Sequence, residues 1–122
     1  MKTAIFDPSG GSIEVSIATT PGRDGSYDLI LWEANQNRVV KEWNGNFINT
    51  DDDEYKLPKP NAKHDGRLLE AMVVVAVPSG AGSCTVDMTV TQDGEELARE
   101  QGTAAPGSGA TLIDLFVKLE SA

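Results

Sequence analysis

The sequence is poor in the residues from which catalytic and metal sites are usually built. Its 122 residues include one cysteine and one histidine, and aromatic side chains make up only 6%. Cys84 cannot form a disulfide within the chain, and as a nucleophile it would need a neighbouring base. Since His64 lies far away in a polar stretch and the residues alternating with Cys84 are apolar, we interpret Cys84 as a core thiol.

Motifs of hydrolases and phosphate-binding proteins are also missing. There is no Gly-x-Ser-x-Gly sequence, and the glycines at 80–82 and 107–109 lack the lysine and the following helix of a phosphate-binding loop. Glu95, Glu96 and Glu100 could supply paired carboxylates, but nothing in the sequence would separate their pKa values for acid–base work. We therefore expect a protein that is not an enzyme.

Basic residues are too few for several classes of partner. Ten lysines and arginines face 19 acidic residues, which gives a formal charge of −9 and an isoelectric point near 4.4. This charge opposes binding to nucleic acid and to anionic bilayers. No apolar run approaches the roughly 20 residues of a membrane span. Asp7 and Pro8 interrupt any signal-peptide core, and the unpaired cysteine suits a reducing compartment, so we expect a cytoplasmic protein.

What the sequence does contain is a series of short segments that alternate apolar and polar residues. Ile13, Val15 and Ile17 are an example, and turn pairs such as Asn44-Gly45 and Asp93-Gly94 separate such segments. Two-residue periodicity with turn residues that accept positive φ predicts hairpins. We expect one domain over residues 1–122, an all-β antiparallel sandwich of two sheets with about eight strands and immunoglobulin-like or jelly-roll connections.

Individual segments predict where these strands lie. Residues 68–77 are the most hydrophobic, with a single charge at Glu70, and predict a central strand buried on both faces. The charges of 95–101 suit an edge strand, although this segment also has helix propensity. Residues 102–109 resemble a loose linker, and 111–119 fit a strand or a helix, of which we expect the strand. Further strands are expected at 2–6, 12–17, 27–32, 38–43, 46–49 and 83–92, with a proline-bracketed edge strand or crossover at 55–57.

Aromatic and amide residues cluster between positions 27 and 55 and offer a candidate ligand site. Trp32 and Trp43 would form the platform, and Asn44 and Asn46 would supply hydrogen-bonding groups. Trp43 stands beside the predicted Asn-Gly turn at a strand end, so we expect it to be partly exposed and to act as a binding anchor. The alternative is that the aromatics fill the core and the amides form turns.

One acidic run is the only candidate metal site. It comprises Asp51, Asp52, Asp53 and Glu54, and oxygen-rich loops of this kind can bind calcium. Consecutive side chains in an extended chain point in opposite directions, however, and the spaced pattern of a calcium loop is absent. If calcium binds, we expect one or more of three residues near strand ends to complete the site: Asp24, Asp28 and Asp65.

These features predict a non-catalytic β-sandwich module that binds another protein through a sheet edge or a loop surface. The alternative is a module that binds a small ligand or carbohydrate, with calcium as an assisting ion and no other cofactor. An edge strand at the end of the sandwich also offers a route to a homo-oligomer.

Overall fold

A computed structural model describes residues 1–47 and 53–122, and in this part of the chain it contains nine strands and one short 3₁₀ helix. No helix within these two ranges is long and apolar enough to cross a membrane. The elements in chain order are β1 (Lys2–Phe6), β2 (Ile13–Thr20), β3 (Gly25–Trp32), β4 (Val39–Phe47), β5 (Asp53–Lys56), η1 (Asn61–His64), β6 (Leu68–Val77), β7 (Cys84–Gln92), β8 (Glu95–Ala104) and β9 (Gly109–Ser121).

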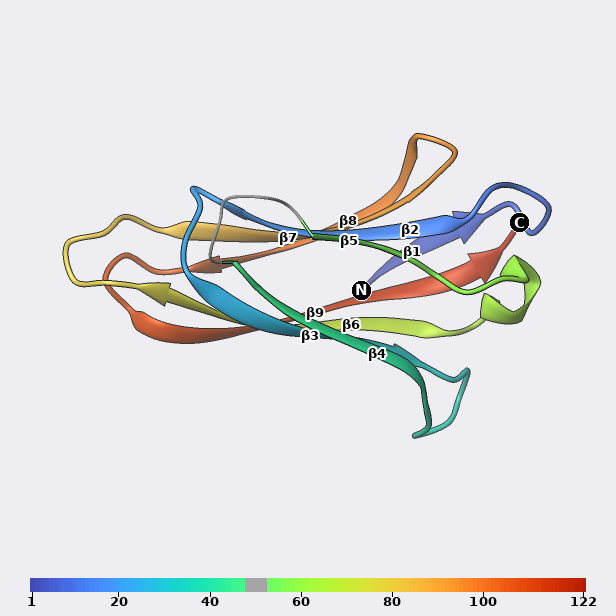
Figure 1. Ribbon diagram of the computed structural model, residues 1–122, viewed down its shortest axis with the longest axis horizontal. Coiled ribbons are helices and arrows are strands. Elements are labelled where there is room, and N and C mark those ends of the chain that lie inside the picture. Colours follow the sequence, from blue (N-terminus) through green and yellow to red (C-terminus); the bar gives the residue numbers. More distant parts are fainter. Residues whose placement is uncertain (48–52) are drawn as a thin grey trace.

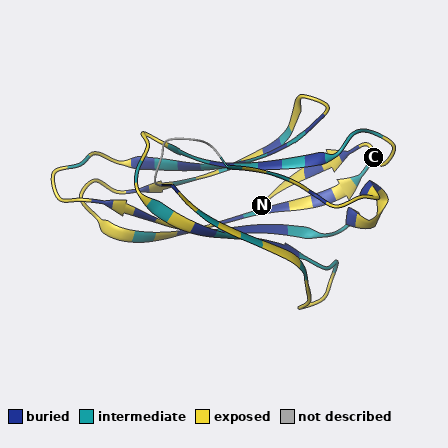
Figure 2. Ribbon diagram, viewed as in Figure 1, coloured by how far each residue is buried: buried dark blue, intermediate teal, exposed yellow. Residues whose placement is uncertain are grey.

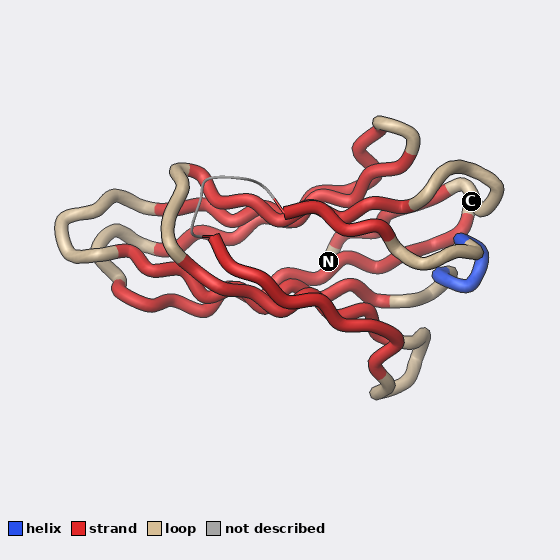
Figure 3. The backbone as a smooth tube through the Cα atoms, in the orientation of Figure 1, coloured by secondary structure: helices blue, strands red, loops and turns tan. Residues whose placement is uncertain are grey.

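The strands form two sheets that lie face to face, which confirms the predicted β-sandwich (Figure 1). One sheet has five strands in the order β1-β9-β6-β3-β4, and the other has four in the order β5-β2-β7-β8. All neighbouring strands are antiparallel except β1 and β9, which run parallel. The helical turn η1 lies at one end of the sandwich, and the β3–β4 and β7–β8 turns project away from the two sheets (Figure 3).

The core lies between the sheets and follows from the two-residue alternation. Ile13, Val15 and Ile17 of β2 are completely buried, whereas the residues between them are partly exposed (Figure 2). The same pattern repeats along β7, where Cys84 is completely buried as predicted. Because every strand sends alternate side chains inward, the two sheets share one contiguous apolar cluster.

Several strand positions agree with the sequence. β3 lies between β6 and β4, as expected for residues 27–32, and the charged β8 is an edge strand. Asp93 and Gly94 both have positive φ at the β7–β8 turn, at 51° and 79°, which confirms a type I′ hairpin. The proline-bracketed segment forms the edge strand β5, and the C-terminal segment is a strand that pairs with β6 and β1.

The prediction of a hairpin turn at Asn44-Gly45 is wrong. β4 runs without a break from Val39 to Phe47, and Gly45 pairs with Tyr27 on β3. A Cβ atom on Gly45 would lie 2.5 Å from the Tyr27 hydroxyl oxygen, so this glycine makes room for a buried ring and does not turn the chain. The separate strand expected after this turn is therefore absent from residues 46–47, and positions 48 and 49 lie outside the described residues.

Two further predictions need correction. β6 is the central strand of its sheet, but its outward side chains are not all buried, since Val74 is 39% exposed. Residues 102–109 are not a loose linker, because β8 extends to Ala104 and β9 starts at Gly109. Gly102 allows the sheets to approach closely, since a Cβ atom there would overlap Ile113 on β9.

We predict that Gly45→Ala lowers the free energy of unfolding by about 1–3 kcal/mol, because the added methyl group overlaps the Tyr27 ring in a packed interior. The measurement is urea unfolding of the single variant, of Tyr27→Phe and of the double variant. Removing the hydroxyl group relieves part of the overlap, so the double variant should lose less stability than the sum of the single variants.

Gly94→Ala provides the control for this double-mutant cycle. Gly94 has positive φ and no heavy atom within 4 Å of its Cβ position, so its substitution strains the backbone without touching Tyr27. Its cost should add to that of Tyr27→Phe. Additive costs for Gly45→Ala as well would contradict the packing role of Gly45.

Candidate functional site

The outer face of the five-stranded sheet is rich in apolar side chains, although no other part of the described chain covers it. Ile30 is 8% exposed but does not belong to the core cluster, which shows that it is buried on the outer side of β3. Its apolar neighbours on this side range from half-buried to largely exposed. Strand alternation assigns the following apolar residues to the face: Ile5, Ile30, Trp32, Val39, Leu68, Met72, Val74, Leu112 and Phe116.

The outer face of the four-stranded sheet has a different composition. Hydroxyl and charged side chains dominate it, as is usual for the wet side of an antiparallel sheet. The outward residues on its two central strands and on β8 include Glu14, Ser16, Thr85, Asp87, Thr89, Thr91, Arg99, Gln101 and Thr103. The two sheets therefore share one core but present opposite chemistry to their surroundings.

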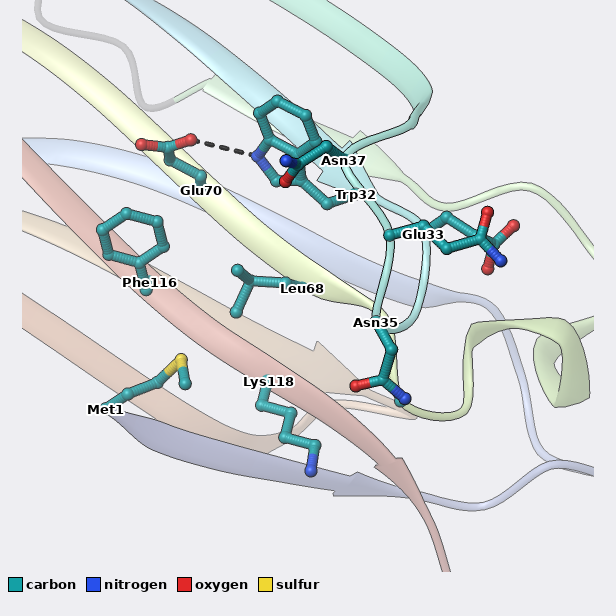
Figure 4. Close-up of a pocket in the computed structure, with 11 residues that line it drawn as sticks. Met1, Trp32, Glu33, Asn35, Asn37, Leu68, Glu70, Phe116 and Lys118 are labelled. Carbon is teal, nitrogen blue, oxygen red and sulfur yellow. Dashed lines mark hydrogen bonds between the residues drawn. The ribbon is translucent and has the colours of Figure 1, made fainter.

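A hollow of about 520 Å³ lies on the apolar face, and we take it as the candidate site. Its floor is formed by Trp32, Leu68 and Phe116, which come from β3, β6 and β9 (Figure 4). The β3–β4 turn forms one wall with three amide side chains, and Met1 and Lys118 form part of the rim on the opposite side. The amide residues of the wall are Asn35, Gln36 and Asn37.

Glu70 is the unusual residue of this hollow. It occupies the centre of the face, in one cross-strand row with Ile30 on β3 and Phe116 on β9. Although it is an acid on an outer face, it is only 8% exposed. Its Oε1 atom accepts a hydrogen bond of 3.0 Å from the indole Nε1 of Trp32, which orients both side chains (Figure 4).

No positive charge compensates Glu70 within the described residues. Burial raises the pKa of the Glu70 carboxyl, and the nearby Asp114 carboxyl raises it further, while the Trp32 hydrogen bond acts in the opposite direction. The salt bridges of the described residues involve neither Glu70 nor Asp114. A buried carboxylate without a cationic partner is costly and therefore marks a candidate binding position.

A second, smaller hollow of about 360 Å³ lies on the same face toward its other end. Asn44 and Asn46 on β4 contribute to it, together with Asp28 on β3. Its apolar part comes from Val74 and Leu112, which is 58% exposed. The two hollows lie along the same apolar face, and amide and acidic side chains border both of them.

A polar network supports the wall of the larger hollow from behind. Arg67 donates two hydrogen bonds of 3.1 Å to the carboxylate of Glu33, which follows β3. Its Nη1 atom also donates to Nδ1 of His64 over 3.1 Å, so the histidine carries its proton on Nε2 and donates it to the carbonyl of Pro58. This network fixes the start of the β3–β4 turn to the helical turn η1.

The structure separates the two tryptophans that the sequence grouped together. Trp32, Asn44 and Asn46 all belong to the outer face of the five-stranded sheet. Trp43 points to the inner side, where it is half-buried and its ring centroid lies 5.7 Å from that of Tyr55. The Lys41 Nζ atom lies 5.2 Å from the centroid of the Trp43 ring. Trp43 therefore stands in mid-strand at the open side of the core, away from the hollows.

The acidic run is only partly described, because Asp51 and Asp52 lie outside the described residues. Asp53 points inward on β5 and accepts a 2.6 Å hydrogen bond from the Tyr27 hydroxyl group, which also contacts that of Tyr55. Glu54 points outward beside Glu14, which raises the pKa of Glu54. Among the described residues, no group of three or more histidine, cysteine or acidic side chains is arranged to hold a metal ion.

Cys84 and His64, the other residues with reactive side chains, are buried in surroundings typical of structural residues. The Cys84 thiol lies 3.6 Å from the carbonyl oxygen of Pro21, and burial raises its pKa, which disfavours the reactive thiolate. His64 is 1% exposed, with both ring nitrogens engaged by Pro58 and Arg67.

Sequence reasoning missed Glu70 and Phe116 as site residues. The available signal was a single acid within the valine-rich segment 68–77, opposite an aromatic residue in a segment that alternates strongly. Interpreting 68–77 as buried on both faces concealed that signal, because it implied a cover that the described chain does not provide.

Comparisons with protein-family models, with curated proteins and with solved structures give no match for this chain.

We predict that Glu70→Gln raises Tm by about 2–4 °C at pH 7.5, because it removes a buried charge and keeps an oxygen that can accept the Trp32 hydrogen bond. The folded-state pKa of Glu70 is raised, so the penalty of its charge appears only as the pH rises through that pKa. The difference in Tm from the wild-type protein should therefore disappear near pH 4. Thermal unfolding followed by circular dichroism measures both values, and a lower Tm at pH 7.5 would contradict the assignment.

A second prediction concerns the pH dependence of stability through His64. Burial, with a smaller contribution from Arg67, lowers the pKa of His64 from its ordinary value of 6.5. Below pH 6.5 the unfolded chain therefore binds a proton that the folded chain does not, and stability falls as the pH drops, by at most about 1.4 kcal/mol per pH unit. Urea unfolding between pH 7.5 and 5.5 should show a shallower decline for His64→Gln. Parallel declines would refute this role.

Proposed function

We propose that this protein is a non-catalytic β-sandwich module that binds another protein through the outer face of its five-stranded sheet. The observation that carries the proposal is the contrast between the two outer faces. An apolar face of this extent on one side of a sandwich, opposite a polar one, is typical of an interaction surface.

The rigidity of this face supports its use in recognition. Its side chains project from paired strands of one sheet, so little conformational entropy is lost when a partner covers them. Trp32 and Phe116 are the aromatic residues on it, and aromatic anchors at the centre of an interface supply much of the binding energy. The polar and acidic residues along β4 and at the hollows would form a polar rim.

A different protein is a better candidate partner than a second copy. Strand alternation places several acids on this face and one lysine, Lys118. Two copies meeting face to face would bring like charges together, and the chain already carries a net charge of −9. If the protein forms a homo-oligomer, we propose that two copies pair through an edge strand. The buried, unpaired Cys84 suits a reducing compartment such as the cytoplasm.

A small-ligand or carbohydrate-binding module is the second candidate. The specific observation in its favour is that Trp32 and the amides of the β3–β4 turn border one hollow, as aromatic platforms and amides do in many ligand sites. The indole N–H of Trp32 is already bound to Glu70, which leaves its ring for stacking.

We expect the double substitution Val74→Ser and Leu112→Ser to reduce the recovery of specific protein partners about tenfold or more, because it removes exposed apolar contacts worth at least ~1.4 kcal/mol. The measurement is affinity capture from an extract of the source cells, with quantitative mass spectrometry. Thr89→Ala combined with Gln101→Ala, on the opposite outer face, is the matched control and should leave recovery unchanged.

Both variants change solvent-accessible positions, so their Tm values should stay near that of the wild-type protein and loss of fold would not explain a loss of partners. Equal recovery by the two variants and the wild-type protein would reject the outer face as the interface. Quenching of tryptophan fluorescence by soluble oligosaccharides, together with equal recovery, would favour the ligand-binding alternative.

A further inference from the structure

We infer that the protein partner docks a cationic side chain, arginine or lysine, against Glu70 in the middle of the apolar face. This inference rests on the proposed function and specifies the chemistry of the partner. It identifies the larger hollow as a socket for one charged group within an otherwise apolar interface.

The first argument is the incomplete hydrogen bonding of Glu70. A carboxylate can accept about four hydrogen bonds; Trp32 donates one of them, and a side-chain hydrogen bond with Asp114 occupies a second position. Both Glu70 and the indole face the same hollow, so the remaining acceptor positions are open to a group that enters from outside (Figure 4). A guanidinium or ammonium group supplies several donors at once and adds opposite charge.

The second argument is the combination of rings and acids around this position. Phe116 pairs directly with Glu70 across β6 and β9, and Trp32 is hydrogen-bonded to it from β3. A cation at the carboxylate therefore lies close to two aromatic rings, which attract positive charge through their faces. A second acidic group, the Asp114 carboxyl on β9, lies near Glu70.

The third argument is charge complementarity over the whole face. Apart from Lys118, the charged residues that alternation places on its strands are acidic. These acidic residues are Asp28, Glu42, Glu70, Asp114 and Glu120. A partner segment that carries basic groups among apolar ones matches this pattern, whereas an acidic or purely apolar partner would leave the buried charge of Glu70 without compensation.

The experiment uses two blocked peptides, acetyl-Leu-Val-Arg-Val-Leu-amide and its twin with citrulline in place of arginine. Citrulline preserves the shape and most donors of arginine but has no charge. The chain contains two tryptophans, so a ¹H–¹⁵N NMR spectrum shows two indole signals, and Trp43 serves as an internal control away from the site. The Trp32 signal should shift in a saturable manner, with binding of the arginine peptide about fivefold tighter than that of its twin.

Substitution of the acids separates charge from shape. Glu70→Gln should abolish the preference for arginine over citrulline, and Asp114→Asn should reduce it. Asp87→Asn, on the opposite outer face, is the matched control and should change nothing. Because Glu70→Gln is expected to stabilise the fold, a loss of preference in that variant would not reflect unfolding.

Several outcomes would overturn the inference. Equal binding of the two peptides to the wild-type protein, no binding of either, or a shift of Trp43 in place of Trp32 would each do so. Equally tight binding of acetyl-arginine-amide alone would also reject it, since the site would then be one for a small cation. If Val74→Ser with Leu112→Ser loses the captured partners but Glu70→Gln does not, the proposed function stands and the cationic anchor fails.

Discussion

The alternation of inward and outward side chains is the constraint on which this structure depends. Each strand has two faces, and the described chain builds two layers, so one face of each sheet meets the core and the other has nothing from this chain above it. A sheet can be apolar on both sides only if something else covers its outer side. In the five-stranded sheet, β3, β6 and β9 carry apolar side chains on their outer side as well as in the core, interspersed with charged ones. The proposed interface thus rests on the two-layer architecture and on the apolar residues that β3, β6 and β9 carry on their outer side.

Much of the fold could be predicted from the sequence, because local patterns decide it. The burial of Ile13, Val15 and Ile17 and the Asp93-Gly94 hairpin follow from periodicity and turn chemistry. Asn44-Gly45 has the same turn signature but lies within β4, because the decisive contact is that of Gly45 with Tyr27, eighteen positions earlier in the chain. Pairing between distant segments is the information that a local pattern lacks.

The candidate site shows the same division between local and long-range information. Trp32, Asn44 and Asn46 could be selected from the sequence as polar or aromatic residues near turns, and they lie on one face. The single acid in segment 68–77 was a local signal for Glu70, but the role proposed for this residue depends on three strands meeting in one register, which no local pattern gives. A buried acid with a raised pKa beside an aromatic side chain is the kind of local conflict that functional sites often contain.

The parallel pairing of β1 with β9 has a mechanical consequence. Lys2 lies beside Val117 and Phe6 beside Ser121, so the two terminal strands overlap side by side and leave the sandwich in opposite directions. Tension applied to the ends of the chain would load the whole ladder of hydrogen bonds in shear, and these bonds would have to yield together. A hairpin loaded at its open end would instead unzip one bond at a time. Under such tension, the parallel β1–β9 pair should therefore resist separation more strongly than a terminal hairpin would.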